Sequence, residues 1–266
     1  MISLFIFLLG LAAGSFLNAV IYRLEKGESA LRGRSYCPHC KHELAWRDLI
    51  PVLSFLILRG RCRSCGEKIS WQYPAVEIFT AFIFLLIFNS QFSSFNQVLN
   101  FQIFKVFYLF AAASLLIVIF VYDLKYYLIS DKILFSAILI SCIWYLVSRI
   151  FFHFYPGYEI LHIVYSAFGA SAFFLAIFLV SRGRWMGFGD VKLAFFMGLF
   201  LGWPNILVAL FVAFLLGAII GIGLIVLKKK GLKSEVPFGP FLVTGTFIAL
   251  FWGEYMVTWY WNLFSV

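Results

Sequence analysis

The chain has 266 residues, of which 63% are hydrophobic and only 12% are charged, against roughly 25% charged residues in soluble globular domains. This composition excludes a water-soluble globular protein and predicts an integral membrane protein. The net charge of +9 comes from basic residues that flank apolar segments, and this placement favours a role in membrane orientation over nucleic-acid binding.

Apolar runs of about the length that crosses ~30 Å of hydrocarbon as a helix recur along the chain. Their unbroken character argues against a transmembrane barrel, whose strands alternate apolar and polar residues. We therefore expect an all-α polytopic membrane protein with about eight transmembrane helices. The expected helices cover residues 3–22, 74–90, 103–122, 132–151, 160–181, 190–203, 205–227 and 239–262.

The first run has no basic region before it and Arg23 after it. Because this order is opposite to that of a secretory signal peptide, we expect an uncleaved helix with its amino end outside. The first, third, fifth and seventh connections then face the cytoplasm. They hold nearly all lysines and arginines, including the lysines at 228–230 and 233, as the positive-inside rule requires.

Residues 23–73 form the one long connection, and they contain two Cys-x-x-Cys pairs, Cys37 with Cys40 and Cys62 with Cys65. Four thiolates in two tight turns match the tetrahedral coordination of Zn²⁺, and a reducing cytoplasm disfavours disulfides. We expect one structural zinc ion, with reduced bystander thiols or a redox dithiol as alternatives. The loop's basic residues either fix topology or meet anionic headgroups or an acidic partner.

Two acids lie at the ends of apolar runs. Asp123 closes the run 103–122, and Asp190 follows Gly187 and Gly189 in Gly-Phe-Gly-Asp at the start of the run 190–203. Charged groups at membrane depth are costly and are usually functional. A carboxylate pair with one member ionised and the other protonated can hydrolyse an amide bond, and the two glycines permit close backbone approach.

Each acid also has a structural interpretation. Asp190 fits a helix cap, and Asp123 fits a solvated residue paired with Lys125. A third acid, Asp131, opens the run 132–151, where it either caps that helix or lies near the same site.

The motifs together resemble those of the bacterial type IV prepilin peptidases, which are membrane aspartic proteases of the Gly-x-Gly-Asp type. A lone Gly-x-Gly-Asp is weak, but the ordered set spans almost the whole chain. In chain order, the set comprises Gly14-Ser15-Phe16-Leu17-Asn18, Tyr22-Arg23, the two cysteine pairs, Gln72-Tyr73-Pro74-Ala75-Val76-Glu77, Asp123 to Asp131, Gly187-Phe188-Gly189-Asp190 and Pro237-Phe238-Gly239-Pro240-Phe241. One departure is Ser130, where the family commonly has proline.

The resemblance implies that Asp123 and Asp190 are catalytic, with Gly187, Gly189 and Asp131 supporting the substrate site. It further implies removal of a short basic leader from type IV prepilins or pseudopilins, at the cytoplasmic face of the bacterial inner membrane. Many members then methylate the new amino terminus with S-adenosylmethionine. This activity is associated with the cysteine loop, so the implied division is a first helix over 1–22, a zinc loop over 23–73 and a peptidase core over 74–266.

Other interpretations remain open at this point. The chain fits a peptidase without methyltransferase activity, a transporter that uses the aspartates as ion sites, or a non-enzymatic assembly factor that binds pilin-like helices. The expected partners are prepilin substrates and the lipid bilayer, with no nucleic acid. No glycine-rich nucleotide-binding motif assigns the methyl-donor contacts, and the sequence does not define the oligomeric state.

Overall fold

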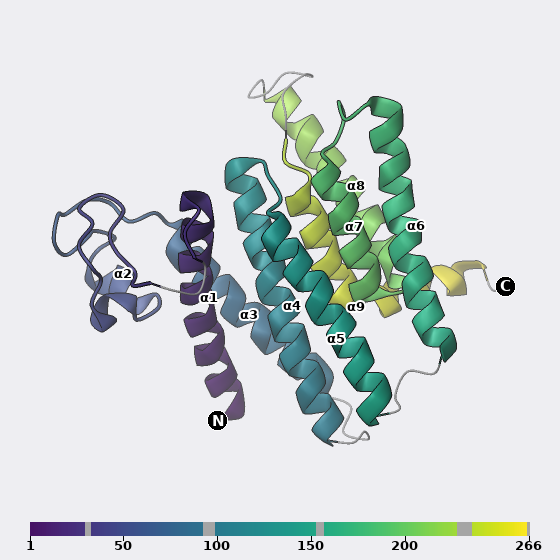
Figure 1. Cartoon of the computed structure of the whole chain (residues 1–266), viewed down its shortest axis with the longest axis horizontal. Helices are drawn as coiled ribbons and strands as arrows, with labels where there is room; N and C mark the ends of the chain where they lie inside the picture. The colour runs from purple at the N-terminus through teal and green to yellow at the C-terminus, as the bar shows by residue number, and fades with distance from the viewer. Residues whose placement is uncertain (30–32, 93–98, 153–156, 228–235, 265–266) are drawn as a thin grey trace. The chain divides into compact units, whose positions relative to one another are not determined.

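A computed structural model describes residues 1–29, 33–92, 99–152, 157–227 and 236–264, and these residues are mainly helical outside the loop that contains the two cysteine pairs (Figure 1). The lysines at 228–230 and 233 lie outside the described residues. The elements are α1 (Ile2–Lys26), the 3₁₀ turn η1 (Trp46–Leu49), α2 (Leu53–Ile57), α3 (Gln72–Phe92), α4 (Leu99–Tyr126), α5 (Asp131–Phe152), α6 (Gly157–Ser181), α7 (Phe188–Leu201), α8 (Asn205–Val226) and α9 (Gly239–Phe264).

The prediction of an all-α polytopic membrane protein is confirmed. Within the described ranges, seven helices are long and apolar enough to cross a membrane, namely α1, α3, α4, α5, α6, α8 and α9. The remaining predicted run, 190–203, forms α7, whose 14 residues extend only about 21 Å at 1.5 Å per residue. Helices satisfy every backbone polar group internally, which is what hydrocarbon demands of a spanning segment.

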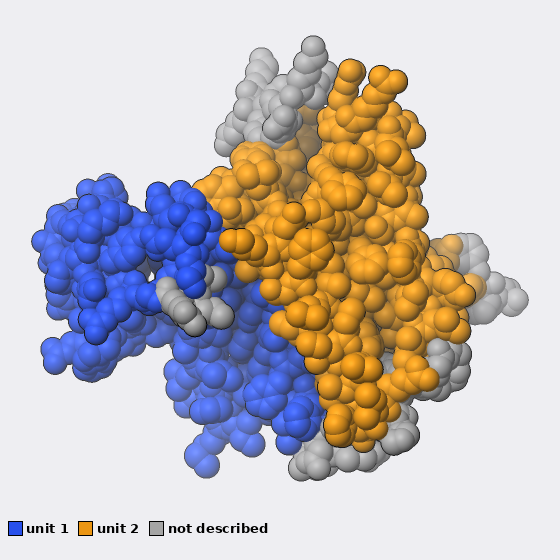
Figure 2. All heavy atoms as spheres, viewed as in Figure 1, with its two compact units in different colours: residues 1–118 blue, residues 119–266 orange. Residues whose placement is uncertain are grey.

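The chain divides into two compact units, residues 1–118 and 119–266 (Figure 2). In the first unit α1 packs against α3, and two glycines of α1 allow the close approach. A Cβ atom on Gly10 would lie 2.5 Å from Cα of Ala81, and one on Gly14 would lie 2.6 Å from Cα of Glu77. The α1–α3 contact is therefore a small-residue interface of the kind common between membrane helices.

In the second unit the short helix α7 contacts α5, α6, α8 and α9. Nine of its 14 residues are buried, including Asp190. Gly198 of α7 faces the backbone of α6, because a Cβ there would lie 2.5 Å from Cα of Ala167. The position of Asp190 is thus fixed by helices packed on several sides.

Candidate functional site

Asp123 lies in the last turn of α4, a helix that ends at Tyr126. The chain leaves the helix through Tyr127, which has a φ of 58° and donates its backbone N–H to the carbonyl of Asp123. Only 5% of Asp123 is exposed, and the Lys125 ammonium lies over the Tyr126 ring. Asp123 is therefore a buried carboxyl and not a solvated residue.

Asp190 is the third residue of α7, and only 8% of it is exposed. Gly187, with extended backbone dihedrals, occupies the cap position of this helix. The backbone N–H of Asp190 donates to the carbonyl of Gly187, and the Asp190 carboxyl contacts the Gly187 backbone in turn. Asp190 thus sits inside the first helical turn, where the helix dipole favours a negative charge.

The two carboxyls come from different helices and interact electrostatically with each other. The backbone of Gly239, the first residue of α9, contacts the Asp123 carboxyl. A Cβ atom on Gly239 would lie 2.5 Å from Oδ2 of Asp123. That Oδ2 atom is buried and has no hydrogen-bond partner among the described residues, which is unusual for a buried oxygen. The site is therefore a carboxyl pair flanked by the first turns of α7 and α9.

Asp131 begins α5 and forms an ion pair with Lys192 of α7. The Lys192 ammonium also lies over the rings of Phe135 and Phe188. Gly189 packs against Ile129, since a Cβ on Gly189 would lie 3.1 Å from the Ile129 Cβ. The segment between α4 and α5 is thereby tied to the start of α7, the helix that carries Asp190.

Gly239 is the residue near the carboxyls to which sequence reasoning gave no role. Its motif, Pro237 to Phe241, was part of the resemblance, but no periodicity shows which glycine meets which acid. The available signal was its position: Gly-Pro directly before an apolar run marks a helix start, because proline is tolerated in the first turn.

The four cysteines of the long loop form one cluster. The sulfur atoms of Cys37, Cys40, Cys62 and Cys65 all lie within 4.8 Å of one another, and those of Cys37 and Cys65 are 3.9 Å apart. A tetrahedral zinc–thiolate site has sulfur atoms about 3.8 Å apart, given Zn–S bonds near 2.3 Å. Backbone hydrogen bonds from Cys65 and Ser64 lower the pKa of the Cys62 thiol to about 7. The cluster therefore can hold a metal such as zinc.

The two halves of this cluster repeat the same backbone pattern 25 residues apart. Cys37 N–H donates to the His42 carbonyl, and Cys62 N–H donates to the Glu67 carbonyl. Likewise Tyr36 pairs with Glu43, and Arg61 pairs with Lys68, each as an isolated antiparallel bridge. Each half is a knuckle that presents two sulfurs from one turn. His39 and His42 are exposed, as expected for residues outside the sulfur cluster.

The geometry defines a polytopic membrane protein with a buried carboxyl pair and a four-cysteine cluster. Comparisons with known proteins show the family to which the chain belongs. Residues 8–91 match the bacterial peptidase A24 N-terminal domain, and residues 110–222 match the type IV leader peptidase family. No solved structure matches the chain.

Similar curated proteins carry the name prepilin leader peptidase/N-methyltransferase. The one from Aeromonas hydrophila is 31% identical over 96% of this chain and 92% of its own length. That from Bacillus subtilis (strain 168) is 30% identical over 96% of both chains, and that from Legionella pneumophila is 31% identical over 95% of this chain and 92% of its own. This chain therefore belongs to the type IV leader peptidase family.

Proposed function

We propose that this chain cleaves the leader from type IV prepilins or pseudopilins and then methylates the new amino terminus. The observation that carries the peptidase proposal is the carboxyl pair. Asp123 and Asp190 come from separate helices, are both buried and interact with each other. Family membership points to the same reaction, and the names of the relatives support both activities.

In the proposed mechanism, one carboxyl of the pair is ionised and the other is protonated, since two like charges in close contact do not both ionise at low cost. The ionised member takes a proton from a water molecule, whose oxygen attacks the scissile carbonyl carbon. The protonated member donates a hydrogen bond to the carbonyl oxygen, and a proton then passes to the leaving amine. The unpartnered Oδ2 of Asp123 supports a role for this carboxyl in binding water or the peptide.

In this proposal the glycines beside the acids leave room for the substrate peptide. Gly187 and Gly239 stand next to the Asp190 and Asp123 carboxyls respectively, and neither has a side chain that would block an extended peptide. A peptide carbonyl there lies close to backbone N–H groups at the starts of α7 and α9, and such groups favour developing negative charge.

The position of Asp123 at the end of a helix supports the proposed substrate. Asp123 is in the last turn of one candidate span, so the pair lies at the edge of the bilayer. A prepilin has a basic leader followed by an apolar helix, and the junction between the two sits at headgroup depth. We propose that the site lies at the cytoplasmic face of the bacterial inner membrane, because basic residues predominate on the connections assigned to that side.

The cysteine cluster would hold a structural Zn²⁺, and when bound the ion would supply folding free energy to the loop. The described part of the loop has only the short helical elements η1 and α2, so we expect bound metal to contribute to its stability. Methylation uses S-adenosylmethionine as the expected methyl donor, and we assign no residues to it. In the proposed division, residues 23–73 serve methylation and residues 74–266 serve cleavage.

The test replaces each acid with its neutral isostere in the full-length protein. We expect Asp123→Asn and Asp190→Asn each to lower the cleavage rate between about 10²-fold and 10⁴-fold, because each removes one half of the acid–base pair. Mass spectrometry of a prepilin in liposomes measures both cleavage and amino-terminal methylation.

Glu254→Gln is the matched control, because Glu254 is an exposed carboxyl on α9, and it should cleave at the normal rate. A normal cleavage rate in either aspartate variant would contradict the assignment of Asp123 and Asp190 as the catalytic pair. Cleavage without any methylation by the unaltered protein would support the proposed peptidase and contradict the proposed methyltransferase activity.

A further inference from the structure

The cysteine loop carries an apolar surface that cleavage does not use. Helix α2 exposes Leu53, Leu56 and Ile57 at 52%, 62% and 68%, and Trp71 is 75% exposed just before α3 begins. In water such a cluster is unfavourable. Its presence in a loop joined at both ends to membrane helices indicates a surface that meets lipid.

A hydrogen bond ties this surface to the beginning of α3. The backbone N–H of Val52, which immediately precedes α2, donates to Oε2 of Glu77 at 2.7 Å. Glu77 is five residues into the span that begins at Gln72, about 7.5 Å along the helix axis. Interfacial helices bury their apolar faces about 5–10 Å into the headgroup and acyl boundary. A position of α2 beside the first turns of α3 is compatible with that boundary.

Val52 supports this conclusion, because its φ of 59° is one that β-branched residues rarely adopt. Such a conformation persists only where surrounding contacts impose it. The contact with the buried Glu77 carboxyl is one that does so here.

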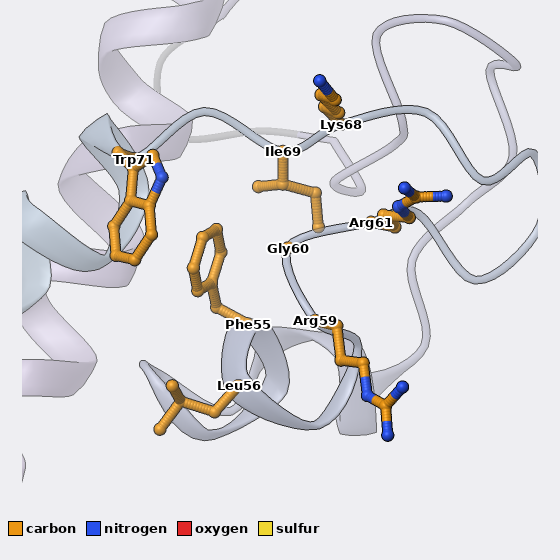
Figure 3. Close-up of a pocket in the computed structure, with 8 residues that line it drawn as sticks. All are labelled: Phe55, Leu56, Arg59, Gly60, Arg61, Lys68, Ile69 and Trp71. Carbon is orange, nitrogen blue, oxygen red and sulfur yellow. The ribbon is translucent and has the colours of Figure 1, made fainter.

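A pocket of about 490 Å³ opens beside α2. Its apolar wall consists of Phe55, Leu56, Ile69 and Trp71, and the rings of Phe55 and Trp71 are 4.9 Å apart. Figure 3 shows Phe55, Ile69 and Trp71 gathered together. Gly60 also lines the pocket, and its lack of a side chain leaves room for the Phe55 ring, which a Cβ there would approach to 3.1 Å.

Three cations complete the same pocket: Arg59, Arg61 and Lys68. Figure 3 shows their charged ends extending away from the apolar side chains. Arg61 and Lys68 face each other across an antiparallel bridge, so their side chains are neighbours. All three are exposed, the lining includes no carboxylate, and none forms an ion pair within the described residues.

We propose that this pocket binds an anionic phospholipid. The apolar wall contacts the upper acyl chain, and the phosphate binds the neighbouring side chains of Arg61 and Lys68. The bond from Val52 to Glu77 holds the pocket beside the start of a candidate membrane helix, which favours a lipid over a soluble anion. The positive charge also disfavours the basic leader of a prepilin as the occupant.

The test measures lipid binding to the full-length protein in detergent by native mass spectrometry. The probes are phosphatidylglycerol, phosphatidylcholine with the same acyl chains, and glycerol 3-phosphate as the free headgroup. We expect the unaltered protein to bind phosphatidylglycerol most tightly and the free headgroup least. Because each cation near an anionic lipid contributes about fivefold in affinity, Arg61→Gln with Lys68→Gln should weaken phosphatidylglycerol binding about 25-fold.

The matched control is Lys41→Gln with Arg47→Gln, which removes two exposed charges from the same loop outside the pocket and should change binding less than twofold. Leu56→Ser should weaken binding of both lipids, because it removes part of the apolar wall. Equal affinity for the two lipids, an unchanged affinity in the Arg61 and Lys68 variant, or free headgroup binding as tight as phosphatidylglycerol would each overturn the proposal. Zinc content checks that every variant is folded.

Discussion

Gly239 is the residue whose substitution tests the geometry of the carboxyl pair most directly. An added Cβ would lie 2.5 Å from Oδ2 and 3.1 Å from Cγ of Asp123, so the carboxyl would have to move. A displacement of about 1 Å at a catalytic group costs about 100-fold in rate. We therefore expect Gly239→Ala to lower the cleavage rate about 100-fold with little change in thermal stability, measured with the same prepilin assay.

Gly169→Ala in α6 is its control, because a Cβ there meets no atom within 4 Å, and cleavage should be unaffected. Normal cleavage by Gly239→Ala would show that the Asp123 carboxyl does not need the position seen here.

Among the elements, the α1–α3 pair depends on glycines where the two backbones touch. A Cβ on Gly14 would lie 2.6 Å from Cα of Glu77 and 3.1 Å from the carbonyl oxygen of Val76. Backbone atoms cannot rotate away, and overpacking of this kind costs about 1–3 kcal/mol. We expect Gly14→Ala to destabilise the first unit by that amount, measured as a lower thermal midpoint in detergent.

Gly221→Ala in α8 is the comparison, since its Cβ would meet open space and alanine favours helix. A midpoint for Gly14→Ala equal to that of Gly221→Ala would contradict the close approach of α1 and α3. The Asn18 amide donates to the carbonyls of Gly14 and Tyr73. Its bond to Tyr73 joins α1 to α3 and would be disturbed if the two helices moved apart.

The long helices were predictable from sequence because a segment in hydrocarbon must satisfy its backbone internally. The apolar runs at 3–22 and 103–122 indeed lie within α1 and α4. The short elements η1 and α2 were not predicted. A five-residue helix has little intrinsic stability, and α2 depends on the contact of Val52 with Glu77, a residue 25 positions away that no local pattern identifies.

At the scale of the whole molecule, the two acids and the four clustered cysteines lie in separate parts of the chain. Asp123 and Asp190 interact electrostatically with each other, and the hydrogen-bond partners described for them are Tyr127, Gly239 and Gly187, all within residues 119–266. The types of residue at each site could be predicted from sequence. The approach of the Asp123 carboxyl to the start of α9 could not, because it arises from the packing of helices that are distant in sequence.

We expect purified protein to contain one zinc ion per chain, and its removal with a strong chelator should make four additional thiols reactive toward alkylation. Methylation should then fall to background while cleavage persists, because no described contact of the acids comes from the loop. Metal analysis and mass spectrometry of the prepilin amino terminus measure both effects.

Cys62→Ser should reproduce the effect of the chelator. Cys142→Ser should not, because Cys142 lies on α5 outside the cluster. Normal methylation by metal-free protein would contradict the assignment of the loop.

The pairing of the cysteines in two similar knuckles has a consequence for how the loop responds to oxidation. Each knuckle supplies two thiolates, and the hydrogen bonds of one recur in the other. Because a closed zinc–thiolate site takes four sulfurs, oxidation of either pair would remove half of the ligands, so damage to one knuckle would release the ion from both.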